Sequence, residues 1–407
     1  MRRPWAALFG IIFVSTWCGN QFSPLLLLYQ QRQHYSALTV NLFLGVYVLG
    51  LAPALLVAGA LSDRHGRRPV MTAGVLCALA ASTSLTFGST GPAAIYLGRL
   101  LSGVTVGIAM SVGNSWLKEL SQAPHDPDAD TAAGARRASL AFALGSALGA
   151  LVAGGIAQWG PWPEQLPFLV HIGVTLPFVW FVVRLPETSF GGVPGPLRAQ
   201  LRIPALAHKR FRRVVMIASP WLFAAAALAY GYLPVLLAKA TGRWGLAYAT
   251  LLTVLTLGTA ALVQPWAKRI HSPDSARGLF TALASITAGI ALAGITAWRT
   301  SVPLGIVTGI VLGVGIGLGM VSGLLEVQRI ATRTDLAGLT GVFYALAYAG
   351  FLTPTVMAAI SSWVPTVPLF FALAVLAALC CAALLASSRK HLPAADVPTP
   401  VTPSPYR

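Results

Sequence analysis

Twelve apolar runs, each long enough to cross a lipid bilayer as a helix, divide this chain of 407 residues. A bilayer core is about 30 Å thick, so a spanning helix needs roughly twenty apolar residues. Because 56% of the residues are hydrophobic and 10% are charged, a soluble fold of this length could not cover its apolar surface. The sequence therefore predicts an all-α integral membrane protein. The runs are 5–28, 38–60, 70–88, 93–116, 138–160, 166–185, 214–237, 245–266, 278–298, 302–325, 336–360 and 365–387.

The runs fall into two sets of six that resemble each other. Three glycines and a methionine recur at an offset of 210 residues, as Gly103, Gly107, Met110 and Gly113 and then as Gly313, Gly317, Met320 and Gly323. Two related bundles with a site between them is a common transporter plan. We expect six-helix bundles at 1–188 and 214–388, related by a pseudo-two-fold axis. A basic cytoplasmic linker at 189–213 and a disordered cytoplasmic tail at 389–407, rich in Pro, Ser and Thr, complete the expected organisation.

Basic residues indicate the orientation. Most of the 28 Lys and Arg residues fall in segments on the N-terminal side of the membrane, and cytoplasmic loops are where these residues concentrate. We therefore expect both termini in the cytoplasm. Frequent Arg, Ala and Gly favour a bacterial inner membrane. The net charge of +17 does not indicate a nucleic-acid partner, because the cations are not gathered on one element with interleaved aromatic residues.

A polar motif separates the second and third runs and reads Gly59-Ala60-Leu61-Ser62-Asp63-Arg64-His65-Gly66-Arg67-Arg68-Pro69. Gly59 allows two helix ends to approach, and Gly66 permits a tight turn. The carboxylate of Asp63 suits the positive N-terminus of a neighbouring helix. A basic loop that serves only to set orientation is the alternative.

The motif closely resembles the signature loop of the major facilitator superfamily. That resemblance implies a conformational latch made of Gly59, Asp63, Arg64, Gly66, Arg67 and Arg68. It also implies that Asp63 meets the helix that begins near Asp335-Leu336, in one conformation but not in the other. Leu185-Pro186-Glu187-Thr188 is similar to the end of the sixth helix in this family, and the chain looks most like its drug exporters. The antiporter signature is matched only in part, since Ala150 stands where that signature has proline.

Polar groups inside the apolar runs are candidates for solute binding, because an ionised side chain is costly in lipid. Arg99 is the one charge firmly inside a run, and snorkelling to the interface is its alternative. We expect several of these groups to face a central cavity. Packing between helices is the alternative for His171 and Tyr348. The candidates are Asn20, Gln21, Asn41, Arg99, His171, Tyr230 and Tyr348.

Acidic residues are informative by their positions. None of the eleven falls near the middle of a run, and Glu326 stands at the end of one, where we expect an ion pair with Arg329. Proton coupling would use His171 or an acidic residue at the membrane edge, such as Asp63 or Glu326. Transport without proton coupling is the alternative. Together with Arg99, the missing deep carboxylate favours an anionic or neutral, partly apolar solute.

These features predict a secondary transporter that moves a small solute by rocker-switch alternating access. We expect efflux of a drug-like or metabolic compound. Facilitative or proton-coupled uptake of a nutrient or metabolite is the runner-up, and a lipid-handling or sensory membrane protein of the same fold is the third alternative. We expect no enzyme, because the runs hold no paired carboxylates or histidine–carboxylate set. No phosphate-binding loop is present, so we expect no ATP-driven pump, and the four cysteines lack metal-ligand spacing, so we expect no cofactor and no metal. We also expect a monomer.

Overall fold

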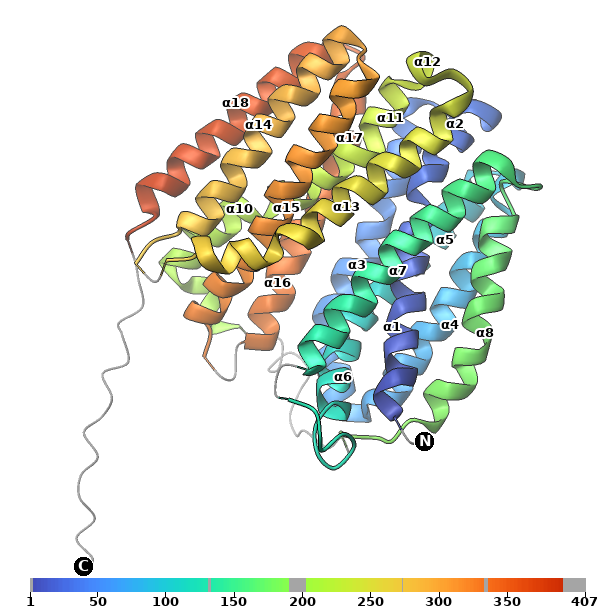
Figure 1. Ribbon diagram of the computed structural model, residues 1–407, viewed down its shortest axis with the longest axis vertical. Helices are drawn as coiled ribbons and strands as arrows, with labels where there is room; N and C mark the ends of the chain where they lie inside the picture. The colour runs from blue at the N-terminus through green and yellow to red at the C-terminus, as the bar shows by residue number, and fades with distance from the viewer. Residues whose placement is uncertain (1–2, 131–132, 190–202, 273, 333–335, 391–407) are drawn as a thin grey trace, which may run out of the picture.

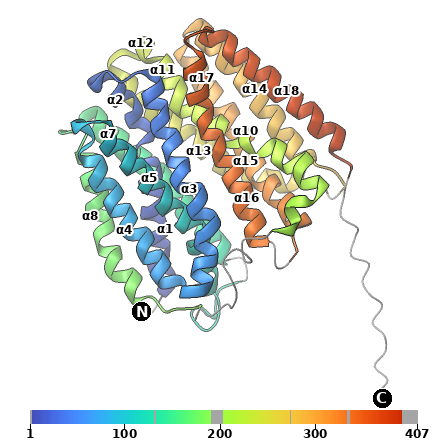
Figure 2. The same ribbon diagram turned by 180° about the vertical axis from the view of Figure 1, so that it is seen from behind.

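The computed structural model describes residues 3–130, 133–189, 203–272, 274–332 and 336–390. Within these ranges the chain forms twelve helical spans that are long and apolar enough to cross a membrane, which confirms the predicted all-α fold. Figures 1 and 2 show the spans gathered in two bundles that lie side by side. Nearly all of the predicted tail and much of the predicted linker lie outside the described residues.

Several of the spans are built from more than one helix. The first six are α1 (Pro4–Asn20) with α2 (Leu26–Gln33), α3 (Ala37–His65), α4 (Arg67–Thr86), α5 (Pro92–Ile108) with η3 (Ala109–Gly113) and α6 (Asn114–Leu120), α7 (Ala133–Trp159), and α8 (Leu166–Arg184). The last six are η5 (Phe211–Val215) with α10 (Met216–Ala226), η6 (Ala227–Tyr232) and α11 (Leu233–Leu236); α12 (Ala238–Thr241) with α13 (Gly245–Ile270); α14 (Arg277–Arg299); α15 (Val302–Ile330); α16 (Leu336–Ala349) with η8 (Gly350–Leu352) and α17 (Thr353–Ile360); and α18 (Thr366–Ser387).

The predicted signature loop is almost entirely helical. α3 continues to His65 and α4 begins at Arg67, so only Gly66 separates the two helices. Hydropathy marks the stretch inside the hydrocarbon, whereas a helix can continue into water, and the sequence-based boundary was therefore too early. Gly66 has a φ of +97°, where a side chain would be strained. We call the end of the molecule that carries Gly66 the motif end and the opposite end the far end.

The second and fourth spans of each half pack closely through glycine. Gly103 on α5 lies so near the backbone of Tyr47 on α3 that a side chain would collide with it. In the second half, Gly313 on α15 lies in the same way against the backbone of Thr256 on α13. Small residues allow helix backbones to approach in a membrane. The sequence match at an offset of 210 residues thus corresponds to the same helix contact in both halves.

The outside of the bundles has the pattern of a protein embedded in lipid. Leucines such as Leu262 and Leu379 are exposed along the spans. Of the seven tryptophans that are exposed among the described residues, five lie at the far end and two, Trp180 and Trp266, lie toward the motif end, so both bilayer interfaces carry the residue they prefer. The five at the far end are Trp159, Trp162, Trp244, Trp298 and Trp363.

Candidate functional site

A cavity lies between the two halves. Its volume is about 40 Å³, which holds water but not a drug-sized molecule. Four of the predicted solute-binding residues meet there although they come from four different spans: Asn20, Arg99, Tyr230 and Tyr348. Other residues of the wall are Tyr47 and Ser146 from the first half and Phe223 and Phe351 from the second.

Arg99 brings a buried positive charge to the cavity wall. The residue is 2% exposed, which argues against snorkelling. Its Nε donates to the carbonyl oxygen of Phe43 (3.1 Å), and a terminal nitrogen donates to that of Gly19 (3.1 Å). The guanidinium carbon lies 4.9 Å from the ring centre of Phe22 and 4.5 Å from that of Tyr47. Carbonyls and ring faces stabilise the cation without neutralising it, and no carboxylate in the described ranges pairs with it.

Stacked aromatic rings form the part of the wall that the second half contributes. Phe223 on α10 stacks on Tyr348 of α16, with ring centres 4.1 Å apart and planes 14° apart. Phe351 stacks with both, at 5.4 Å from Phe223 and 5.8 Å from Tyr348. Tyr47 of the first half meets Tyr348 edge-on at 6.1 Å. Sequence reasoning missed Phe223, Phe351 and Tyr47, because aromatic residues in an apolar span carry no signal that separates a cavity wall from ordinary packing.

Gln21 and His171 lie away from the cavity, within the first half. Gln21 Nε2 donates to the Ser82 hydroxyl (2.9 Å), which donates to Nδ1 of His171 (2.8 Å). Nε2 of His171 lies 2.9 Å from the carbonyl oxygen of Val14, so in neutral His171 the proton sits on Nε2. The chain joins α1, α4 and α8. This placement matches the packing alternative for His171.

Three hydrogen bonds between described residues join the halves near the far end. Gln158 Nε2 at the end of α7 donates to the carbonyl oxygen of Arg243 (2.8 Å), and its Oε1 accepts from the Ala247 N–H in the first turn of α13 (2.9 Å). The Thr355 hydroxyl donates to the carbonyl oxygen of Asn41 (2.9 Å). Asn41 therefore contributes its backbone to a contact between the halves, while its side chain donates within α3.

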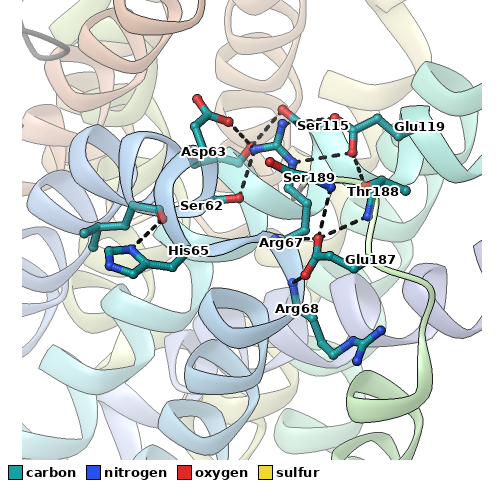
Figure 3. A network of polar contacts seen from close by, with 12 residues as sticks. Ser62, Asp63, His65, Arg67, Arg68, Ser115, Glu119, Glu187, Thr188 and Ser189 are labelled. Carbon is teal, nitrogen blue, oxygen red and sulfur yellow. Dashed lines mark hydrogen bonds and ion pairs between the residues drawn. The ribbon is translucent and has the colours of Figure 1, made fainter. Parts of the chain in front are cut away.

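Charged side chains cross-link the motif end of the first half (Figure 3). Arg67 at the start of α4 pairs with Asp63 in the last turn of α3 (2.6 Å) and with Glu119 of α6 (3.0 Å). The Thr188 hydroxyl also donates to Glu119. Asp63 remains half exposed. Asp335, at the predicted start of the partner helix, lies outside the described residues, so the latch stays a prediction.

One further motif residue, Gly59, has a clear role in packing. A Cβ at Gly59 would lie 3.0 Å from the Ser111 hydroxyl of η3, so this glycine lets the two helices approach as expected. Arg64 lies half-buried in the last turn of α3. The remaining basic residue, Arg68, lies in the first turn of α4.

Glu187 holds the start of α4, as Figure 3 shows. Its carboxylate oxygens accept from the N–H groups of Arg67 (2.8 Å) and Arg68 (2.9 Å), which have no partner inside their own helix. Burial raises the pKa of the Glu187 carboxyl, but hydrogen bonds from these and neighbouring N–H groups outweigh it and hold the pKa below its ordinary value. The chain that enters the linker is thereby tied to the motif.

A second charge cluster lies at the motif end of the second half. Arg210, which the sequence places in a basic linker, is fully buried and bonds to both carboxylate oxygens of Glu326 (2.7 and 2.9 Å). Glu326 also pairs with Arg329 (3.2 Å), as predicted. Burial and the charge of Arg329 lower the pKa of His271. The signal that could have found Arg210 is Glu326, since a carboxylate buried at a span end requires a strong cation partner.

The sequence has relatives among known proteins. Residues 8–349 match a sequence model described as Major Facilitator Superfamily. The chain is 28% identical over 213 residues to the multidrug transporter QDR2 of Candida glabrata, and 32% identical over 174 residues to the multidrug efflux pump LfrA of Mycolicibacterium smegmatis. These matches cover 51% and 40% of this chain but 35% and 31% of those proteins. The chain thus spans about a third of the length of the curated relatives it matches.

Solved structures share the fold across nearly the whole chain. A POT family transporter in complex with 5-aminolevulinic acid has a TM-score of 0.79 at 12% identity, covering 96% of each chain. A mutant form of the nucleoside transporter NupG has a TM-score of 0.72 at 13% identity, covering 94% of this chain and 99% of that one. The human organic anion transporter MFSD10 has a TM-score of 0.64 at 20% identity, with the same coverage. At these identities the likeness concerns the fold alone.

Proposed function

The chain belongs to the major facilitator superfamily, and within that family we propose that it exports a drug-like or metabolic compound by rocker-switch alternating access. Membership makes it a secondary transporter with multiple membrane spans. Export is supported by two relatives that are named as multidrug transporters, although the shared segments cover about a third of each.

The observation that carries the proposal is the cavity between the halves. Both halves contribute to its wall, as a site exposed alternately to two sides requires. The buried charge of Arg99 favours an anionic or neutral solute, because a cationic one would be repelled. The stacked rings of Phe223, Tyr348 and Phe351 favour a flat apolar body. We therefore infer an aromatic solute that is neutral or carries a negative group.

The contacts between the halves support loading from the motif end. Hydrogen bonds join the halves near the far end, so a solute would enter from the opposite side. Arg64, Arg67 and Arg68 lie at the motif end, and the preference of basic residues for the cytoplasmic side assigns that end to the cytoplasm. In this orientation the cavity loads from inside, as an exporter requires.

The moving units of the proposed cycle are the halves at 1–188 and 214–388. Asp63 would change partners during the movement, from Arg67 to the N-terminus of α16, and so act as the latch. No carboxylate belongs to the described cavity wall. A proton, where one is coupled, would therefore be carried by Asp63 or Glu326 at the motif end.

Counterflow in proteoliposomes tests the proposal. We would load vesicles with unlabelled aromatic carboxylates and measure entry of a labelled one, with and without a pH gradient. Arg99→Ala should lower the exchange at least tenfold, whereas Arg99→Lys should keep part of it and Arg299→Ala, at the far end, should keep all of it. Exchange of cations in preference to anions would overturn the solute class. Absence of exchange for every compound would favour the lipid-handling or sensory alternative. Accumulation of the labelled solute inside expressing cells would show import and overturn the proposed direction of transport.

A further inference from the structure

A basic groove, separate from the cavity, opens at the motif end of the second half. It has a volume of about 440 Å³ and lies where α14 begins and α18 ends. Its lining combines three exposed cations, Arg277, Arg389 and Lys390, with the apolar side chains of Phe280 and Leu385. Within the described part of the chain, none of the three cations pairs with a carboxylate. Its size falls in the range of about 300–1,000 Å³ that is typical of ligand sites.

Buried charges hold one wall of the groove in place. Arg210 pairs with Glu326 and donates from another nitrogen to the carbonyl oxygens of Ser388 (3.1 Å) and Lys390 (3.0 Å). The Ser388 carbonyl and hydroxyl oxygens both accept from the N–H of Ala276, the residue before α14. The basic segment after α18 is thus fastened both to the buried cluster and to the start of α14.

The equivalent place in the first half is occupied by an anion. Both places lie between the start of a third span and the end of a sixth span, and Arg68 matches Arg277 at an offset of 209 residues. In the first half, Glu187 follows α8 and sets its carboxylate on the first N–H groups of α4. In the second half, α14 has no side-chain cap, and Arg389 stands after α18 in place of an acid. Among the described residues, the second half therefore leaves this place basic and open, whereas the first half fills it with its own carboxylate.

We propose that this groove binds the phosphate headgroup of an anionic phospholipid. The phosphate would lie among Arg277, Arg389 and Lys390, beside the N-terminus of α14, where free N–H groups favour an anion. Phe280 and Leu385 belong to membrane spans, and Leu385 is 56% exposed, so an acyl chain can follow them into the bilayer. A soluble anion would leave this apolar wall uncovered. Basic pockets between spans at the cytoplasmic face are suited to anionic headgroups.

A lipid in this position would connect two helices of the second half. α14 and α18 pack against each other along the outside of that bundle (Figure 1). The headgroup would join the start of one to the end of the other, as Glu187 joins α8 to α4 in the first half. The site is distinct from the solute cavity and does not depend on the proposed transport activity.

Native mass spectrometry of the purified full chain tests the proposal, with dioleoylphosphatidylglycerol, dioleoylphosphatidylcholine or inorganic phosphate added. The test variant removes the three cations, and a matched control removes two arginines and a lysine that are exposed elsewhere at the motif end. Each basic residue near an anionic headgroup raises the affinity about fivefold. Loss of all three should therefore weaken the binding of phosphatidylglycerol by the test variant roughly 100-fold. The control should bind like the wild type. The test variant is R277Q/R389Q/K390Q, and the control is R212Q/K268Q/R269Q.

A second variant keeps the test decisive where the triple substitution unfolds the protein. Arg389→Glu supplies the carboxylate that the first half has in Glu187, and it should abolish phosphatidylglycerol binding while raising the melting temperature of the lipid-free protein. Equal binding of the two phospholipids, equal loss in both triple variants, or unchanged binding in Arg389→Glu would overturn the proposal. Displacement of phosphatidylglycerol by millimolar inorganic phosphate would identify a soluble anion as the ligand instead, and would overturn it as well.

Discussion

The side-chain amide of Gln158 should hold the far end closed, so its removal should open that end. Two of the hydrogen bonds between the halves use this amide, one to the carbonyl oxygen of Arg243 and one from the N–H of Ala247. In Gln158→Leu, a side chain of similar size preserves the packing of α7 on α13 but can form neither bond. The Ala247 N–H then has no partner within its own helix, because it lies in the first turn of α13.

The size of the effect follows from the two bonds. A neutral hydrogen bond contributes about 0.5–1.5 kcal/mol, and both bonds lie near the surface, so together they stabilise the closed far end by about 1–2 kcal/mol. At about 1.4 kcal/mol for each factor of ten, Gln158→Leu should lower the ratio of closed to open far ends about 5- to 30-fold. Gln158→Glu keeps the acceptor for Ala247 and should produce a smaller change.

Pulsed electron spin resonance between the two halves measures that ratio. Thr90 and Ser362 are exposed at the far end, one in each half, and can carry the labels. The wild type should give mainly a short distance, and Gln158→Leu should add a longer one. Gln165→Leu is the control, because Gln165 bonds to Ser89 within the first half. An unchanged distance distribution in Gln158→Leu, or an equal change in Gln165→Leu, would refute the reasoning.

Four further substitutions separate the roles assigned to charged and polar groups. Glu187→Gln should lower the free energy of unfolding by about 0.5–2 kcal/mol, through weaker capping of α4. Hydrogen bonds hold the pKa of Glu187 below its ordinary value, so the stabilisation by Glu187 is fully present at a pH above that ordinary value. The stabilisation is lost as the pH falls through the folded-state pKa. The melting temperatures of variant and wild type should therefore converge in acid. Arg210→Met should destabilise the protein by about 3–5 kcal/mol by leaving Glu326 under-paired, and the double variant with Glu326→Met should recover part of the loss; a double variant no more stable than the single one would contradict this. Asp63→Asn should impair transport but not membrane insertion, and full flux in that variant would remove the latch. His171→Gln should lower the melting temperature without moving the pH profile of transport, whereas a proton carrier would move it.

The spans could be predicted from the sequence because lipid imposes a length requirement on every one of them. The prediction failed where the helices leave the hydrocarbon. α3 and α15 continue for several residues past the predicted ends, and their last turns carry the charges of the motif end, such as Asp63 and Glu326. Hydropathy cannot register a helix in polar surroundings, so the motif was expected as a loop although one residue, Gly66, makes the turn.

The candidate site could be predicted only where a residue type is unusual in its surroundings. Arg99 stood out because it is a charge in an apolar run, and it does line the cavity. Gln21 and His171 stood out because they are polar residues in apolar runs. A span that is apolar on every side does not reveal which face meets which neighbour, and both side chains point into the first half. Arg210 was missed because it stands among basic residues that are exposed, and because Arg329, which is nearer in sequence, already gives Glu326 an expected partner.

The small cavity limits which solutes can drive the cycle. A volume of about 40 Å³ admits no solute until the halves separate, and separation costs the edge contact between Tyr47 and Tyr348. Both hydrogen bonds of the Arg99 side chain go to carbonyl oxygens of the first half, so Arg99 does not itself join the halves. A ligand shifts a conformational equilibrium only through a difference in its affinity for the two states. An aromatic anion seated between Tyr47 and Tyr348 would replace the lost ring contact and pair with Arg99, and it would do so in the separated state alone. A solute that lacks either the ring or the charge would bind the separated state more weakly, would offset less of the cost of separation, and should be moved more slowly.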